Sequence, residues 1–240
     1  MFIVEGNIGA GKSTFLKIMQ QLLPHITTAL EPIALWDTPD QGNSLLERFI
    51  QDPHRWAYTM ETFTMMCRVR EHLHYQKQIA LPGAPDLLVE RSIYSGHYVF
   101  SLNGYRQGFM TEQEWQMYLI YFNYLIPSWC KAPRGFIYLR TDPEIAYQRI
   151  QKRSRNSETG ISLEYLQQVH EQHEQFLIRK ENILENLQQV PVLVLECDQE
   201  FEENSGMAQE HSRKLLEFMN QQLQHTYTTG ATTQCSSCAG

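Results

Sequence analysis

The segment that most constrains this chain lies near its N-terminus, where a short apolar run leads directly into a glycine-rich turn and then a helical pattern. Residues 6–13 have the sequence GNIGAGKS, which matches the phosphate-binding pattern G-x-x-x-x-G-K-[S/T]. Between a strand and a helix, such a loop surrounds phosphate with backbone N–H groups and the helix N-terminus. Lys12 is expected to reach the β- and γ-phosphates, and Ser13 to ligate Mg²⁺. The pattern predicts ATP or GTP binding by Gly6, Asn7, Ile8, Gly9, Ala10, Gly11, Lys12, Ser13 and Thr14.

Strand-like and helix-like segments alternate along the chain, which predicts an α/β fold. Strand candidates cover residues 2–4, a segment near Leu30, and residues 87–89, 136–139 and 191–195. Helix candidates follow the phosphate loop, begin at Asp52-Pro53, Thr111, Asp142-Pro143 and Ser162, and end with one over about 205–224. We expect one domain over 1–225, a P-loop fold with about five parallel strands flanked by helices on both faces. Residues 226–240, composed mostly of Thr, Ser, Gly, Cys and Ala, are expected to be a disordered tail.

Charge and hydropathy narrow the classes of partner. The 240 residues carry 20 Lys+Arg against 27 Asp+Glu, a net charge of −7, which argues against a broad basic surface for nucleic acid. No apolar run approaches the ~18 residues of a membrane helix. The N-terminal residues lack the basic region of a signal peptide, so we expect a cytoplasmic protein with no membrane partner. Five scattered cysteines do not suggest a disulfide framework.

Two carboxylates follow predicted strands. Glu31 precedes Pro32 at the end of the second strand, and Glu90 ends the third. Carboxyl ends of parallel strands line the crevice where ligands bind, which suits a general base and a magnesium ligand. A buried structural carboxylate is the alternative for each. The chain has no guanine-binding N-K-x-D segment, which argues against a switch GTPase.

A basic cluster follows the helix that begins at Asp142-Pro143. It contains Arg149, Lys152, Arg153 and Arg155 and runs into the segment NSETG. A solvated helix end complementing the helix dipole would explain these charges without function. In a phosphate-transfer enzyme, the same cluster would form an arginine-rich lid that neutralises the transferring phosphoryl group.

Taken together, these motifs resemble those of the deoxyribonucleoside kinase family, which includes deoxycytidine, deoxyguanosine and mitochondrial-type thymidine kinases. The resemblance spans residues 2 to about 220 and rests on EGNIGAGKS (5–13), Glu-Pro…Trp (31–36), Arg55-Trp56, ERSIYS (90–95), RSRN (153–156) and LEYL (163–166) with the following His170. It implies a five-stranded parallel sheet, a homodimer packed through helices, and transfer of the ATP γ-phosphate to a nucleoside 5′-hydroxyl in nucleotide salvage.

The resemblance also implies roles by position. Glu31 corresponds to the general base, Arg91 to the contact that positions the reacting oxygens, and Glu90 with Ser13 to the Mg²⁺ ligands. Arg149, Arg153 and Arg155 correspond to the lid, Arg153 and Phe201 to contacts with ATP, and Glu158 to the contact with the sugar 3′-hydroxyl. The base pocket corresponds to Ile33, Trp36, Leu46, Phe49, Met60 and Phe100, for each of which ordinary core packing is the alternative.

The chain departs from the family pattern near the base. Glu61 stands where the family usually has glutamine, and an ionised carboxylate would favour bases that present N–H groups, such as guanine or thymine. Arg68 is expected to pair with Glu61 or donate to a base carbonyl. Gly96 is expected to open space near the base, which favours thymidine and leaves purines open. Ile50 replaces a tyrosine that helps bind the sugar in relatives, which puts selection against ribose in doubt.

Two other functions compete with this interpretation. A nucleoside monophosphate kinase would need an arginine beside Glu31 for the acceptor phosphate, and the sequence places none there. A nucleotide-binding subunit without catalysis would not need Lys12, Glu31, Arg91 and the lid arginines together.

Overall fold

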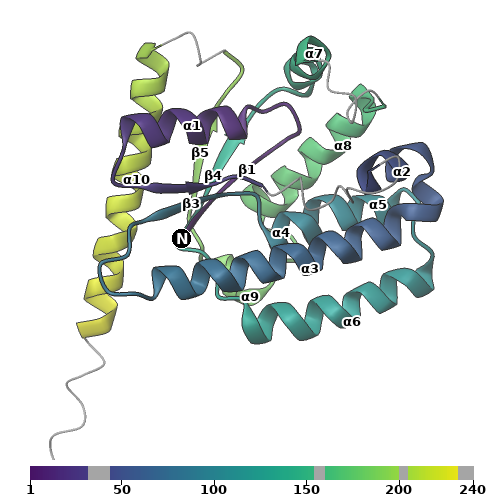
Figure 1. The fold of residues 1–240 in the computed structure, drawn as a ribbon, viewed down its shortest axis with the longest axis horizontal. Coiled ribbons are helices and arrows are strands. Elements are labelled where there is room, and N and C mark those ends of the chain that lie inside the picture. Colours follow the sequence, from purple (N-terminus) through teal and green to yellow (C-terminus); the bar gives the residue numbers. More distant parts are fainter. Residues whose placement is uncertain (32–43, 154–159, 200–204, 232–240) are drawn as a thin grey trace, which may run out of the picture.

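The computed structural model describes residues 1–31, 44–153, 160–199 and 205–231, and its centre is a five-stranded sheet (Figure 1). The strands are β1 (Phe2–Gly6), β2 (Thr27–Ala29), β3 (Leu87–Glu90), β4 (Gly135–Arg140) and β5 (Val192–Glu196). They pair in the order β2-β3-β1-β4-β5, and each neighbouring pair is parallel. The predicted α/β fold with five parallel strands is confirmed.

Helices connect and cover the strands. They are α1 (Lys12–Leu22), α2 (Leu45–Gln51), α3 (Pro53–Ile79), α4 (Ile93–Ser95), α5 (Leu102–Arg106), α6 (Glu112–Trp129), α7 (Pro143–Arg153), α8 (Leu163–His173), α9 (Glu185–Gln188) and α10 (Ser205–Ala231). Two π-helical segments, η2 (Gly96–Ser101) and η4 (Glu174–Arg179), directly continue α4 and α8.

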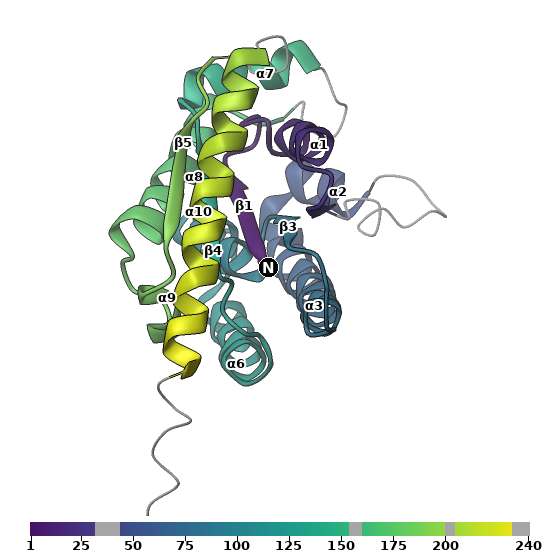
Figure 2. The same cartoon turned by 90° about the vertical axis from the view of Figure 1, so that its left-hand side faces the viewer.

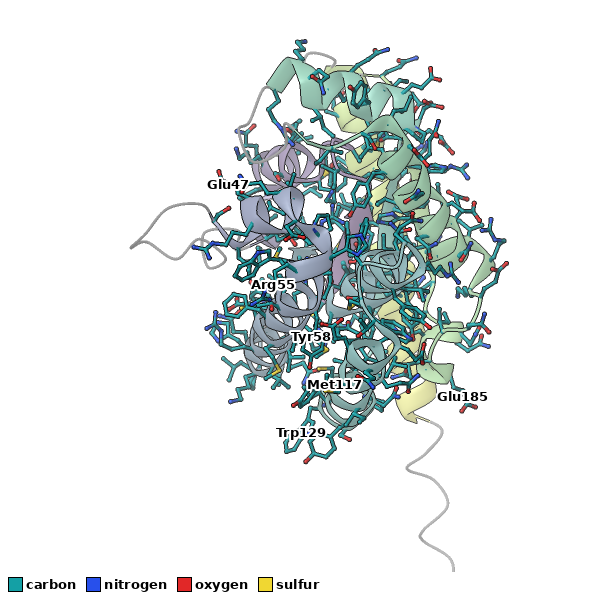
Figure 3. The ribbon with its side chains drawn as sticks, turned by 90° about the vertical axis from the view of Figure 1, so that its right-hand side faces the viewer. Glu47, Arg55, Tyr58, Met117, Trp129 and Glu185 are labelled. Carbon is teal, nitrogen blue, oxygen red and sulfur yellow. The ribbon has the colours of Figure 1, made fainter. Side chains whose placement is uncertain are left out.

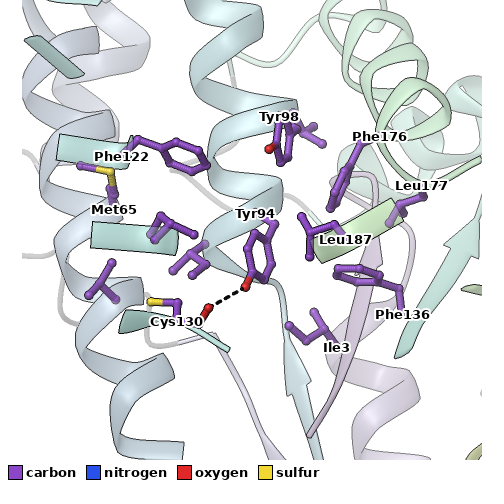
Figure 4. Packing of buried hydrophobic residues seen from close by; sticks show 14 of the residues in the cluster. Ile3, Met65, Tyr94, Tyr98, Phe122, Cys130, Phe136, Phe176, Leu177 and Leu187 are labelled. Atoms are coloured by element: carbon purple, nitrogen blue, oxygen red, sulfur yellow. Dashed lines mark hydrogen bonds between the residues drawn. The ribbon is translucent and has the colours of Figure 1, made fainter. Parts of the chain in front are cut away.

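The central strand β1 contributes side chains to both faces of the sheet, because successive residues of a strand point in opposite directions. Phe2 and Val4 pack in a core with α1 and α10, and Figure 2 shows α10 running along that side of the sheet. Ile3 packs in the second core, whose aromatic centre includes Tyr94 and Phe176 (Figure 4). The expected burial on both faces of a parallel sheet is therefore present.

Predicted helix starts are found where polar caps stand in the sequence. The Asp52 side chain accepts a hydrogen bond from the backbone N–H of Arg55, and Pro53 is the first residue of α3. Thr111 and Glu114 form the expected capping box of α6. Each cap satisfies backbone N–H groups that the first helical turn leaves without partners.

The C-terminal helix differs from the prediction. It continues to Ala231, whereas the composition predicted a helix to about 224 and a disordered tail from 226. Residues 232–240 lie outside the described part of the chain. Within that part, no helix is long and apolar enough to cross a membrane.

Candidate active site

The phosphate loop joins β1 to α1 and has the backbone shape that its glycines allow. Gly9 and Gly11 have φ angles of 82° and 85°, in the left-handed region that glycine adopts readily. A Cβ atom on Gly9 would lie 2.5 Å from the carbonyl oxygen of Ala146, so the loop also packs closely on α7. Lys12 is buried at the start of α1, and its Nζ donates to the carbonyl oxygens of Gly6 at 3.0 Å and Asn7 at 2.7 Å. Burial, with the nearby charge of Arg91, lowers the pKa of Lys12 to about 7.

Ser13 and Glu90 meet at the mouth of this loop. The Ser13 hydroxyl lies 2.9 Å from Oε1 and 3.1 Å from Oε2 of Glu90, which ends β3. The backbone N–H of Glu31 donates to Glu90 Oε2 at 3.3 Å. The ends of β2 and β3 therefore converge on the start of α1, as expected for neighbouring parallel strands.

Glu31 is held by two arginines, contrary to the expectation that none lies beside it, so that expectation does not exclude a nucleoside monophosphate kinase. Arg68 Nη2 lies 2.7 Å from Oε1 of Glu31, and Arg91 Nε lies 3.3 Å from Oε2. Burial by itself would raise the pKa of Glu31, but the charges of the two guanidinium groups outweigh it and hold the pKa below its ordinary value. The carboxylate is therefore ionised at neutral pH.

Arg91 has an unusual backbone conformation. Its φ is 62°, in the left-handed region, and its N–H donates to the carbonyl oxygen of Val4 at 2.9 Å. Its guanidinium lies over the ring of Phe100 at 4.6 Å. Among the described residues, Nη1 of Arg91 has no hydrogen-bond partner although it is buried, which leaves this donor for a ligand oxygen. Strained backbone of this kind often occurs at functional sites.

These groups line one cavity of about 270 Å³. Predicted site residues found in its wall are Ile8, Gly9, Gly11, Lys12, Ser13, Thr14, Glu31, Leu46, Phe49, Met60, Glu61, Arg68, Glu90, Arg91, Phe100 and Arg153. The phosphate loop and the apolar residues predicted for the base thus share one continuous space, with Glu31 among them.

Some predicted residues lie elsewhere. Gly6, Asn7 and Ala10 support the loop from behind without lining the cavity. The guanidinium of Arg149 donates to the carbonyl oxygens of Cys197 and Asp198, at 2.8 Å and 3.1 Å, because the end of α7 packs beside the segment after β5. Ile33, Trp36, Arg155, Glu158 and Phe201 lie outside the described residues.

Four cavity residues were not predicted: Lys17, Thr64, Ile161 and Tyr165. Thr64 could have been predicted from helical spacing, because it lies one turn after Met60 on α3 and so on the same face. Tyr165 is on α8, inside the LEYL segment, and only the tertiary fold brings it to this cavity.

The part of the cavity predicted to hold the nucleobase differs from the expectation that Gly96 opens space there. This glycine does not line the cavity, because the guanidinium of Arg68 lies against it. A Cβ atom on Gly96 would lie 2.9 Å from Nη1 of Arg68. The missing side chain therefore makes room for an arginine and opens no space for the base. Arg68 forms its ion pair with Glu31, whereas the sequence predicted a pair with Glu61 or a contact with a base carbonyl.

Glu61 lies on α3, buried beside Ser101 of η2. The Ser101 hydroxyl donates to Oε2 of Glu61 at 2.6 Å. Burial raises the pKa of Glu61, although the Ser101 hydrogen bond and the charge of Arg68 act in the opposite direction. Glu31 and Glu61 thus lie in one cavity with opposite pKa shifts.

Comparison with known proteins finds relatives along most of the chain. A family model described as deoxynucleoside kinase matches residues 2–222. A mitochondrial deoxyguanosine kinase from Xenopus laevis is 33% identical over 234 residues, which cover 90% of this chain and 88% of the relative. Deoxycytidine kinase 2 from Gallus gallus is 35% identical, covering 87% and 85%, and human deoxycytidine kinase is 33% identical, covering 89% of each chain. These three relatives give no support to the expected preference for thymidine.

Proposed function

The chain belongs to the deoxynucleoside kinase family of ATP-dependent phosphotransferases, and we propose that its cavity transfers the ATP γ-phosphate to the 5′-hydroxyl of a deoxynucleoside. The observation that carries this proposal is the position of Glu31. An ionised carboxylate lies in one cavity with Lys12 and Ser13 of the phosphate loop, next to an apolar pocket. A nucleobase fits such a pocket, whose walls are mainly apolar with a few polar groups.

Glu31 is proposed to accept the proton of the 5′-hydroxyl. Its pKa lies below the ordinary value, so it is a weak base that remains ionised across neutral pH. A weak base suffices because phosphoryl transfer passes through a loose transition state in which the hydroxyl proton leaves late. Arg91 would orient Glu31 through Nε and contact a reacting oxygen through Nη1.

Lys12 and the lid arginines are proposed to neutralise the phosphates. Lys12 is buried, and bound polyphosphate would stabilise its charged form. Arg153, at the end of α7, lines the cavity and is placed to contact the transferring phosphoryl group. We also assign Arg149 and Arg155 to this lid, which for Arg149 requires release from the carbonyl oxygens of Cys197 and Asp198.

Ser13 and Glu90 fit a magnesium site. A hydroxyl and a carboxylate are the oxygen ligands that Mg²⁺ prefers, and they meet beside the phosphate loop. Held by these two residues, the ion would neutralise charge on the phosphates of ATP.

The nucleoside is proposed to bind with its base between Leu46, Phe49, Met60 and Phe100, with Ile33 and Trp36 completing the pocket and Glu158 binding the 3′-hydroxyl. Glu61 would face the polar edge of the base. In its ionised form it accepts hydrogen bonds and so favours thymine and guanine, which present a ring N–H. The relative named as a deoxyguanosine kinase supports the guanine part of this proposal.

A homodimer is proposed to form through α3 and α6, which pack side by side (Figure 3). Exposed apolar side chains on these two helices include Phe63, Met66, Met117, Ile120, Tyr121, Tyr124 and Trp129. Ile120 is 68% exposed and Tyr124 is 64% exposed. An apolar patch of this kind is typical of a surface that a partner covers. Sedimentation should give twice the chain mass, and Ile120→Glu should give the mass of one chain.

The proposed activity is tested by phosphate transfer from labelled ATP with Mg²⁺ to thymidine, deoxycytidine, deoxyguanosine, deoxyadenosine and the matching ribonucleosides. Glu31→Gln keeps the shape of the side chain and removes the carboxylate that accepts the proton, so kcat should fall by about 10²- to 10⁴-fold. Glu217→Gln is the matched control, because Glu217 is exposed on α10. Transfer to none of the nucleosides, or full activity in Glu31→Gln, would contradict the proposal.

A further inference from the structure

Glu61 has a hydrogen-bond partner with two possible acceptors. The Ser101 hydroxyl lies 2.6 Å from Oε2 of Glu61 and 3.0 Å from the carbonyl oxygen of Gly96. A hydroxyl has one proton and can donate it to only one of these oxygens at a time. When Ser101 donates to Gly96, the contact with Glu61 is a hydrogen bond only if Oε2 carries a proton. The same geometry therefore accommodates both an ionised and a neutral Glu61.

The charges around Glu61 do not force either form. Arg68, seven residues along α3, directs Nη2 to Oε1 of Glu31, and its charge lowers the pKa of Glu61. Tyr118 of α6 and Tyr165 of α8 also lie close enough to interact with Glu61. Both phenols have pKa values raised by burial and are neutral near pH 7. Burial of the carboxyl is the largest influence, and it favours the neutral form.

The two forms bind different base edges. An ionised carboxylate only accepts hydrogen bonds, so it binds the ring N–H of thymine or guanine and repels the lone pair at N3 of cytosine or N1 of adenine. A neutral carboxyl offers one donor and one acceptor. With Ser101 donating to Oε2, a proton on Oε1 can be donated to cytosine N3 or adenine N1.

We propose that Glu61 is a specificity-determining residue that selects the base through its own proton: the neutral carboxyl binds deoxycytidine and deoxyadenosine, and the carboxylate binds thymidine and deoxyguanosine. Ser101 supports both forms because its hydroxyl can donate to Oε2 of the carboxylate and also to Oε2 of a neutral carboxyl whose proton is on Oε1. The inference rests on the proposed nucleoside site but requires only that nucleosides bind there.

The test is the ratio of kcat/KM for deoxycytidine to kcat/KM for thymidine, measured across a pH range in which neither base titrates. Effects of pH on Glu31, Lys12 and ATP apply to both substrates and cancel in the ratio. The ratio should fall by up to tenfold per pH unit, because it follows the proportion of neutral to ionised Glu61. Glu61→Gln cannot ionise and should give a ratio independent of pH. A flat or rising ratio in the unmodified protein would overturn the proposal.

Ser101→Ala provides a second variant. The Ser101 hydrogen bond lowers the pKa of Glu61, so its removal favours the neutral form and should raise the ratio at every pH. A lower or unchanged ratio would show that Ser101 does not control the proton. Glu217→Gln, on the other face of the sheet, should keep the pH dependence of the unmodified protein.

Equilibrium binding of the two nucleosides, measured by calorimetry over the same pH range, separates this inference from the proposed activity. Binding whose base preference changes with pH, without phosphate transfer, would support the role of Glu61 and contradict the kinase proposal. Phosphate transfer whose base preference does not change with pH would support the kinase proposal and contradict the role of Glu61.

Discussion

The two ends of the cavity hold buried carboxyl groups whose pKa values are shifted in opposite directions. At the phosphate end, Glu31 has a lowered pKa because Arg68 and Arg91 both contact it. At the base end, Glu61 has a raised pKa because burial outweighs the Ser101 hydrogen bond and the charge of Arg68, both of which lower it. Both side chains lose water, so their charged neighbours decide the sign of the shift.

Arg68 connects these two environments. It lies on the same helix as Glu61, yet its guanidinium is directed to Glu31, beside the backbone of Gly96. Arg68 thus helps to keep Glu31, the proposed proton acceptor, ionised. It leaves Glu61 with a weaker counter-charge. We therefore assign proton transfer to Glu31 and base selection to Glu61, because Arg68 pairs with Glu31 and not with Glu61.

Matched substitutions at the two glutamates should have very different effects on catalysis. Glu31→Gln removes the proposed proton acceptor, so kcat for every substrate should fall by about 10²- to 10⁴-fold. Glu61→Gln changes recognition of the base only, and kcat for its best substrate should stay within about tenfold of the unmodified protein. Steady-state kinetics with four deoxynucleosides measures both. Equal losses in the two variants would remove the distinction between the glutamates.

Arg68→Met should have the next largest effect. Without this guanidinium the pKa of Glu31 rises, so the acid limb of the pH profile of kcat/KM should move to higher pH. We expect kcat/KM at neutral pH to fall by about tenfold or more, because removal of one partner of a buried ion pair leaves the other poorly compensated. Arg70→Met on the same helix is the control, since the Arg70 side chain is 62% exposed. An acid limb that stays in place would mean that Arg91 alone sets the pKa of Glu31.

Local patterns made the phosphate end of the cavity predictable. The loop at 6–13 and the caps at Asp52 and Thr111 act within a few residues of their own positions. Glu31 and Glu90 contact residues far along the chain, but their place was predictable because the carboxyl ends of neighbouring parallel strands meet at one edge of a sheet.

The base end was less predictable because its contacts are distant in sequence. The Arg68 contact with Glu31 spans 37 residues, and that between Ser101 and Glu61 spans 40. The sequence placed Gly96 near the base, but only the packing of α3 against η2 shows that an arginine fills the space. A single sequence gives no measure of which of two nearby acids an arginine will bind.

Gly96→Ala should have a smaller effect and act through Arg68. Gly96 has ordinary helical angles, φ −50° and ψ −49°, so alanine fits the backbone without strain. Its Cβ would crowd Nη1 of Arg68 and displace the guanidinium from Glu31. We expect kcat/KM to fall by roughly 3- to 10-fold, a coupling typical of residues in contact.

A double substitution tests this route. In the Arg68→Met background, Gly96→Ala should cause no further loss of kcat/KM, because the displaced group is already absent. Independent, multiplicative losses would show that Gly96 acts through some other contact.

The smallest expected effect concerns stability, and it separates the glutamates by the sign of its pH dependence. The folded chain raises the pKa of Glu61 above the unfolded value of 4.5, so the stabilising proton is fully bound below that pH and is lost as pH rises towards the folded pKa. The side chain of Glu61→Gln does not titrate. The Tm of this variant minus that of the unmodified protein should therefore increase with rising pH, by about 2–4 °C for each kcal/mol of difference in the free energy of unfolding.

Glu31→Gln should show the opposite trend. The lowered pKa of Glu31 contributes stability that is present above pH 4.5 and is lost as pH falls through the folded pKa. The Tm of this variant should therefore lie furthest below that of the unmodified protein at neutral pH and approach it in acid. Calorimetric unfolding of both variants between about pH 4 and pH 8 measures the two slopes. Slopes of the same sign would mean that one of the two carboxyl groups is paired differently from what the cavity shows, and Arg68 would be the first contact to re-examine.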